Sequence, residues 1–356
     1  MNNDKSQNHS CAWNLLKTIL LAGFILAGVY AYSIWMNRFP ALEGPREVSF
    51  QWEYQDQNYE LKETLYQSVD EYYAKKEKGI LTGQEESSIE KYLAFPKEDT
   101  TISKVSNDLV GLASSQNLAK DETVDLVLAF VQSIPYDKER AATDLTHPRY
   151  PYEILYENLG ICSDKSLLAD ALLRNQGYGT SIFLFTKDEH MALGVACPDQ
   201  YSSYNSGYCF AETTAVGNKI GIIPDLKEDR QATSLGSLPS YSDTGQNAVT
   251  KKLSDPLIMA KKSGSSYDGI VETIALLRSI NTLRSELDAL NTQIAADESS
   301  LKDLGVKLEG YKSIEDYENY NALVPSYNSK LTEIQNEISN YNAKVNRYNE
   351  LIAQFN

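Results

Sequence analysis

The sequence is poor in the residues that build metal sites and disulfide frameworks. Its 356 residues include four cysteines and three histidines. The cysteines form no Cys-x-x-Cys pair and are too few for a disulfide scaffold, so they indicate neither a zinc site nor a disulfide-rich fold. The histidines, His9, His147 and His190, are too few for a multi-histidine metal site. No cofactor motif or calcium-binding loop is recognisable, and we expect neither a cofactor nor a metal.

Positive charge is scarce as well. The chain has 33 lysines and arginines against 49 aspartates and glutamates, which gives a net charge of −16. A charge of this sign repels the phosphates of nucleic acids and the surface of anionic lipid bilayers. Nucleic acid is therefore not expected as a partner, and any contact with a membrane has to come from an inserted segment. The length suits one or two globular domains with an extension.

An apolar run near the N-terminus is the candidate for such a segment. Residues 19–36 carry no charge and lie between Lys17 and Arg38. At about 1.5 Å per residue, this run is close to the minimum length of a membrane-spanning helix. We predict an N-terminal tail at residues 1–18 and a transmembrane helix at residues 19–36. A cleaved signal peptide is the first alternative, and a buried helix of a soluble domain is the second.

The flanks of this run bear on its orientation. Lys5 and Lys17 precede it, and Arg38 and Arg46 follow it, so the positive charges are balanced. A short tail before a large folded domain is typical of a signal anchor whose tail stays in the cytoplasm. We therefore expect a single-pass membrane protein whose main domain is extracytoplasmic.

The region 45–226 carries helical patterns followed by strand patterns. Its first apolar run, residues 48–55, alternates apolar and polar side chains with the period of a strand. The later elements are predicted in chain order, with helices at 102–112, 121–133 and 166–175, then strands at 182–185, 190–196 and 208–213. Helices that precede strands in this way indicate an α+β domain.

The C-terminal part has a different composition. Residues 227–268 are rich in serine, glycine, lysine and aspartate and are predicted to be a linker. Residues 269–356 hold two runs whose apolar residues lie three and four positions apart over about four heptads each, which predicts a coiled coil. Pro325 lies between the runs and is expected to break the helix. A helical hairpin with antiparallel arms is the simplest arrangement, and an intermolecular coiled coil is the alternative.

Cys162, His190 and Glu212 have the residue types of a thiol active site. Cys162 follows the Gly160-Ile161 pair at the start of a helix, where the helix N-terminus favours a thiolate. His190 begins a strand, and Glu212 on the next strand is expected to hold its imidazole. The order cysteine, histidine, carboxylate is that of papain-like sites. A single cysteine of this kind is more often a small buried hydrophobe, so the pattern alone is weak.

Four segments strengthen this interpretation: FVQSIPYD at 130–137, YPYEILYENLGICSDKSLLADALLRNQGYG at 150–179, HMALGV at 190–195 and AETT at 211–214. Together they resemble the core of the transglutaminase-like superfamily, and most closely its membrane-anchored prokaryotic branch. The resemblance covers residues 47–224 and leaves the linker and the coiled coil outside. It implies a papain-like core in which Cys162 begins a helix packed against an antiparallel sheet that bears His190 and the acidic residue.

The sequence departs from the family pattern at two positions near the site. Many members have aspartate where this chain has Glu212, which is one methylene longer. The family often has aspartate before its cysteine, where this chain has Ile161, and the change removes a charge beside the thiol. Asp164 matches a family carboxylate, and we interpret it as a stabiliser of the first helical turn rather than as a catalytic residue.

The resemblance implies a membrane-anchored thiol enzyme that acts on the amide bond of a peptide or a glutamine side chain. A thioester formed on Cys162 would be completed by water in hydrolysis or by an amine in transamidation. Expected partners are a protein or peptide substrate, the membrane, and a coiled-coil partner or a second copy of the chain. The alternative is a non-catalytic, membrane-displayed scaffold or binding protein with a degenerate domain. A purely structural coiled-coil protein is disfavoured by the Gly-x-Cys-x-Asp-Lys-Ser block.

Two further cysteines flank the loop between the last two predicted strands. Cys197 ends one strand and Cys209 begins the next. They are predicted either to form a cross-strand disulfide, which fits an oxidising compartment, or to remain two buried thiols. His147 precedes a proline in a polar loop and is interpreted as a surface residue whose loop borders the cleft.

Overall fold

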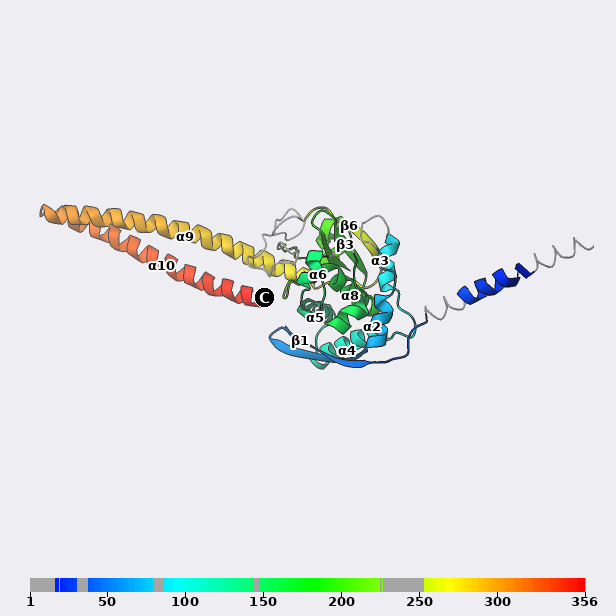
Figure 1. Ribbon diagram of the computed structural model, residues 1–356. Helices are drawn as coiled ribbons and strands as arrows, with labels where there is room; N and C mark the ends of the chain where they lie inside the picture. The colour runs from blue at the N-terminus through cyan, green and yellow to red at the C-terminus, as the bar shows by residue number, and fades with distance from the viewer. Residues whose placement is uncertain are drawn as a thin grey trace, which may run out of the picture.

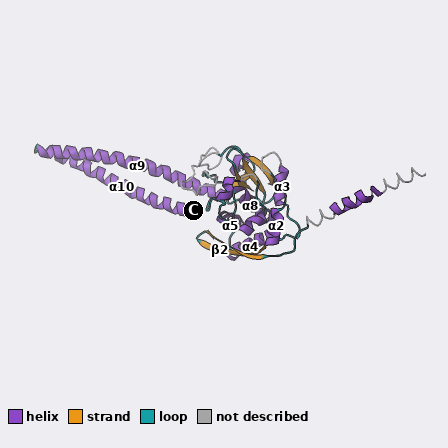
Figure 2. Cartoon of the chain, in the orientation of Figure 1, coloured by secondary structure: helices purple, strands orange, loops and turns teal. Residues whose placement is uncertain are grey.

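The computed structural model describes residues 17–18, 20–30, 38–79, 86–143, 147–224, 226 and 253–355. In these residues a domain of helices and strands carries two long helices that project from it together (Figure 1). The mixture of helices and sheet agrees with the predicted α+β class (Figure 2).

The predicted N-terminal tail and transmembrane helix lie largely outside the described residues. Residues 1–16, 19 and 31–37 are not described, and residues 20–30 are helical. Within the described part of the chain, no helix has both the length and the apolar character needed to cross a bilayer. The transmembrane helix predicted at residues 19–36 is therefore not confirmed.

A β-hairpin opens the domain. Strand β1 (Pro45–Tyr54) pairs antiparallel with β2 (Gln57–Tyr66), and the two-residue turn between them has positive φ at Gln55 and Asp56 (51° and 57°). Two positive φ angles are typical of a type I′ turn, whose twist matches that of the strands. Alternation places one apolar face against the helices: Val48, Phe50, Trp52, Tyr59, Leu61 and Leu65.

In the described residues, seven helices lie between this hairpin and the main sheet along the chain. They are α2 (Gln67–Ala74), α3 (Glu86–Leu93), α4 (Thr101–Ser115), α5 (Lys120–Ser133), α6 (Lys138–Thr143), α7 (Pro151–Glu157) and α8 (Cys162–Asn175). The central one is α8, which contacts α3, α4, α5 and α7 as well as two strands. Residues 162–173 are buried without exception. The polar side chains of α8 must therefore find their partners inside the protein.

A four-stranded antiparallel sheet packs against α8. Its strands are β3 (Thr180–Phe185), β4 (His190–Ala196), β5 (Tyr208–Ala211) and β6 (Leu257–Lys262), in the order β5-β4-β3-β6. Two short 3₁₀ turns, η1 (Asp199–Tyr201) and η2 (Ser203–Asn205), connect β4 to β5. A second apolar cluster lies apart from the main core, at Phe183, Phe185, Ala192, Phe210, Ile223 and Leu253.

Strand β6 corrects the prediction of a linker at residues 227–268. Residues 227–252 lie outside the described part, but residues 257–262 form the edge strand beside β3. Met259 and Ala260 are buried there, and Tyr267 is buried further along. The strand was not predicted because only two of its six residues are buried, so its sequence shows no clean alternation.

The C-terminal arm consists of α9 (Ile270–Ser313) and α10 (Tyr317–Phe355), which pack along each other (Figure 1). Its base belongs to the domain core, where Ile270, Ile274 and Leu277 of α9 are buried in one cluster with Phe355 of α10. The two helices of one chain thus form a hairpin.

The position of the turn between these helices differs from the prediction. Pro325 lies inside α10, and the chain reverses at residues 314–316, where Glu315 has a φ of 59°. The prediction of a helix break at Pro325 is wrong. A proline removes one backbone hydrogen bond but can leave the rest of the helix intact. A residue in the left-handed backbone conformation ends the helix.

Cys197 and Cys209 form a disulfide that joins the end of β4 to the start of β5. Replacing both with alanine is expected to lower the free energy of unfolding by about 2–3 kcal/mol, because a short closed loop regains freedom in the unfolded chain. Urea unfolding followed by circular dichroism measures the change, with Cys162→Ala as the control that removes a thiol outside the disulfide. Equal stability of the double variant and the oxidised wild type would contradict this expectation.

Candidate active site

Cys162 is the first residue of α8 and is 3% exposed. The helix begins there because the Asp164 carboxylate, in its first turn, accepts a hydrogen bond from the N–H of Ile161 (3.1 Å). Gly160 is fixed on the other side, where its N–H donates to the carbonyl of Pro135 (3.1 Å). A Cβ at Gly160 would lie 3.2 Å from that of Asp164, so the close approach of this loop to α8 favours glycine.

The role of Asp164 is wider than the predicted stabilisation of the first turn. The Arg140 guanidinium donates to its carboxylate and to the backbone carbonyl of His147. The Arg149 N–H donates to the other carboxylate oxygen (2.7 Å). Burial raises the pKa of Asp164, while Arg140 and the backbone donors act to lower it. This carboxylate therefore ties Arg140 and residues 147–149 to the start of the helix that carries Cys162.

His190 and Glu212 come together as the sequence predicted. His190 is the first residue of β4, and Glu212 directly follows the last residue of β5 rather than lying within a strand. His190 Nε2 lies 2.9 Å from Glu212 Oε2, and both side chains are fully buried. The other oxygen, Oε1, accepts from the N–H of Thr213 (2.9 Å) and from the N–H and hydroxyl of Thr214 (2.8 and 2.7 Å). The longer glutamate side chain thus reaches the imidazole.

The second ring nitrogen of His190, Nδ1, is not held by Glu212. It is buried and has no hydrogen-bond partner among the described residues. Burial lowers the pKa of His190, but the Glu212 charge and the interactions with Cys162 outweigh it and raise the pKa to about 10. The histidine in turn holds the pKa of Glu212 below its usual range despite burial. The geometry therefore favours an imidazolium between a carboxylate and the cysteine.

This raised pKa predicts an unusual titration of His190. Because the folded-state pKa lies above the usual value of about 6.5, the ring should keep its proton past neutral pH and lose it only near 10. Glu212→Gln removes the stabilising charge and is expected to bring the titration back toward or below the usual value. Selective ¹⁵N-histidine NMR measures it, with His147→Asn to assign the signals. Loss of the ring proton at about pH 6.5 in the wild type would contradict the expectation.

Two buried side chains outside the predicted triad support its position. Ser166 of α8 donates to the carbonyl of Met191 (3.2 Å) and lies 3.1 Å from the Thr213 hydroxyl. Gln132 of α5 donates to the backbone carbonyl of Glu212 (2.8 Å). These contacts cross between distant elements. No local pattern in the sequence indicated them, beyond the presence of polar residues on otherwise apolar helices.

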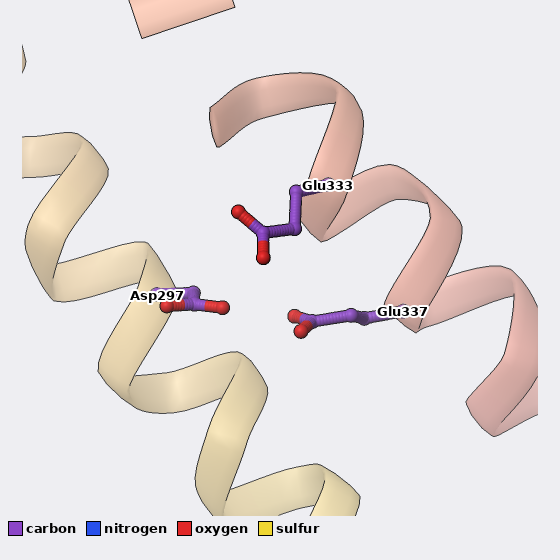
Figure 3. Close-up of side chains that lie close together, drawn as sticks. All are labelled: Asp297, Glu333 and Glu337. Carbon is purple, nitrogen blue, oxygen red and sulfur yellow. The ribbon is translucent and has the colours of Figure 1, made fainter. Parts of the chain in front are cut away.

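A carboxylate cluster in the arm is the one candidate metal site that the described residues contain. The carboxylate oxygens of Asp297, Glu333 and Glu337 lie within 4.8 Å of one another, and the side chains converge from α9 and α10 (Figure 3). The Lys330 ammonium lies among them and donates to Asp297 (2.9 Å) and Glu333 (2.7 Å). The Lys330–Asp297 ion pair joins α10 to a buried position of α9, and a pair of this kind favours one register of the two helices.

Comparison with known proteins bears on the class of this site. The fold places a buried cysteine at a helix N-terminus against an antiparallel sheet that bears His190, and Glu212 pairs with this histidine from just beyond β5. Residues 100–201 match a protein-family model described as a transglutaminase-like domain. Over these residues the chain is similar to a transglutaminase-like domain, and the matched residues include Cys162 and His190 but end before Glu212. No curated protein and no solved structure matched the chain.

Proposed function

We propose that this protein is a thiol enzyme that acts on amide bonds, with Cys162 as nucleophile, His190 as acid and base, and Glu212 as the group that orients His190. The observation that carries the proposal is that the two ring nitrogens of His190 have different surroundings. Nε2 is held by Glu212 at 2.9 Å, and the buried Nδ1 has no partner among the described residues. Interactions with Cys162 also raise the pKa of His190. A core histidine with a purely structural role normally satisfies both nitrogens.

The first half of the reaction breaks the amide bond. The Cys162 thiolate attacks the carbonyl carbon of a peptide or glutamine side chain and forms a carbon–sulfur bond. His190 Nδ1–H then protonates the leaving nitrogen as the carbon–nitrogen bond breaks. The products of this half are an amine or ammonia and a thioester on Cys162. Glu212 keeps the imidazole oriented and stabilises its positive charge throughout.

The oxyanion formed during the attack needs donors close to the sulfur. As the first two residues of α8, Cys162 and Ser163 have backbone N–H groups without an acceptor in a preceding helical turn. These groups are the proposed oxyanion donors. In the second half, neutral His190 takes a proton from water or an amine, which attacks the thioester and restores the thiolate. Hydrolysis and transamidation share every step up to this point.

A glutamine panel tests the proposal. The full chain is incubated with glutamine-containing peptides, with and without a primary amine, and ammonia release is measured. The proposal expects ammonia from the wild type and none from Cys162→Ala. Deamidated product in the presence of amine indicates hydrolysis, and an amine adduct indicates transamidation. Peptide cleavage without ammonia release would place the activity on backbone amides.

A non-catalytic scaffold is the second candidate function. Two observations favour it: Cys162 is only 3% exposed, and a long helical arm extends from the domain. In such a protein the domain would display the arm to a partner or a second copy. Absence of any acyl-donor reaction, together with full retention of arm-mediated association in Cys162→Ala, would support the scaffold over the enzyme.

We also propose that residues 19–36 anchor the chain in a membrane, with the domain outside the cytoplasm. The uncharged run in the sequence supports the anchor, and the Cys197–Cys209 disulfide supports an oxidising compartment. Alkaline extraction of membranes tests the anchor, and protease protection of intact cells tests the orientation. Release of the full chain by alkali would contradict the anchor. Digestion of the domain only after lysis would contradict the placement of the domain outside the cytoplasm.

A further inference from the structure

Lys165 is a fully buried lysine one helical turn beyond Cys162. Its side chain crosses to the C-terminal end of α5, where Nζ donates to the carbonyls of Gln132 (3.0 Å) and Ile134 (2.7 Å). Carbonyls at a helix end lack partners within the helix, so these two bonds satisfy groups that would otherwise be buried unpaired. The mechanism proposed above does not use this residue.

Hydrogen bonding alone does not account for a lysine at this place. A buried ammonium is costly, and burial lowers the pKa of Lys165 to about 7, although the charges of Glu212 and Cys162 act to raise it. A neutral amide or hydroxyl would serve the two carbonyls without that cost. What a lysine adds is positive charge within electrostatic range of the carboxylate and the thiol.

The charges buried at the site balance only when this lysine is included. A thiolate at Cys162 and an imidazolium at His190 cancel, which leaves Glu212 negative and Lys165 positive. The neighbouring carboxylates already have partners, Asp164 in Arg140 and Asp137 in Arg149. Without the ammonium the buried site would carry one net negative charge, and a site of low polarity relieves such a charge by taking up a proton.

We propose that Lys165 is a positioning residue whose ammonium balances Glu212 and thereby keeps Cys162 and His190 in the thiolate–imidazolium form. This inference rests on the proposed function, since it assigns a role in the same site. Lys165 does not touch the reacting atoms. It acts through the electrostatic field at the thiol, so replacing it should change how the reactivity of the Cys162 thiol depends on pH.

The test uses the full chain in a Cys11→Ser background, which leaves Cys162 as the only free thiol. The rate of alkylation of Cys162 by iodoacetamide is measured from about pH 5 to 9, across the range where thiols titrate. Lys165→Gln keeps donors for the two carbonyls but removes the charge. We expect it to shift the rate profile upward by about one pH unit or more, so that the rate at low pH falls about tenfold. Leu167→Ile, a neutral change of a buried residue on the same helix, should leave the profile in place.

The outcomes separate this inference from the proposed function. A wild-type profile like that of a free thiol overturns both. A wild-type profile displaced to low pH that Lys165→Gln leaves unchanged overturns the role of Lys165 and retains the thiol enzyme. An equal shift in Leu167→Ile would assign the effect to packing and also overturn it. Near-UV circular dichroism establishes that each variant is folded before its profile is interpreted.

Discussion

His190→Ala is expected to slow alkylation of Cys162 near neutral pH by about tenfold to a hundredfold. The reason is the loss of the imidazolium, whose Nε2 is held by Glu212 and whose raised pKa depends in part on its interactions with Cys162. Without the imidazolium, the thiol has to ionise unaided. An ordinary thiol is only a few per cent thiolate at about pH 7. The measurement is the iodoacetamide rate across pH in the Cys11→Ser background.

The matched control is His147→Ala, because His147 is the second histidine among the described residues and lies in the segment that borders the start of α8. Its profile should coincide with that of the wild type. A slow wild-type reaction that rises only in the alkaline range, unchanged by His190→Ala, would show that the two side chains do not act as a pair. The arm would then become the place to seek the function.

Asp164→Ala is expected to reduce the free energy of unfolding by about 3–5 kcal/mol, because it leaves the charge of Arg140 buried without its partner. The Arg140 side chain is only 15% exposed and that of Asp164 is fully buried. The substitution also removes the acceptor for the N–H groups of Ile161 and Arg149. Chemical unfolding followed by circular dichroism measures the change.

The control for this experiment is Asp288→Ala, which removes an exposed aspartate in the arm. It should change the free energy of unfolding by less than about 0.5 kcal/mol. A similarly small effect of Asp164→Ala would mean that Arg140 finds another partner or reaches solvent. The double variant Asp164→Ala/Arg140→Met should recover part of the loss, because no unpaired charge remains.

The start of α8 and the strands β3 and β4 were predictable because each is marked locally. A glycine precedes the helix, Asp164 stands in its first turn, and continuous apolar runs mark strands that are buried on both faces. The convergence of His190 and Glu212 followed from the pairing of neighbouring antiparallel strands. The reach of the glutamate did not, because it depends on where β5 ends.

The remaining features depend on contacts between segments far apart in the sequence. Strand β6 pairs with β3 across more than seventy residues of chain, and only its neighbour reveals it as a strand. Lys165 lies on α8, where no charged residue stands three or four positions away from it. Its partners are two carbonyls at the C-terminal end of α5. The turn was wrongly predicted at Pro325. A proline weakens a helix locally, but the packing of α10 against α9 maintains the helix around Pro325.

Trapping the acyl form of Cys162 shows whether this residue is an activated nucleophile. The folded chain is mixed with p-nitrophenyl acetate, quenched in acid and examined by peptide mass spectrometry. We expect one acetyl group on Cys162, formed rapidly in the wild type, slowly in His190→Ala and absent in Cys162→Ala. A folded wild-type chain that carries no acetyl group on Cys162, or acquires it no faster than His190→Ala, would show that Cys162 is not activated by His190.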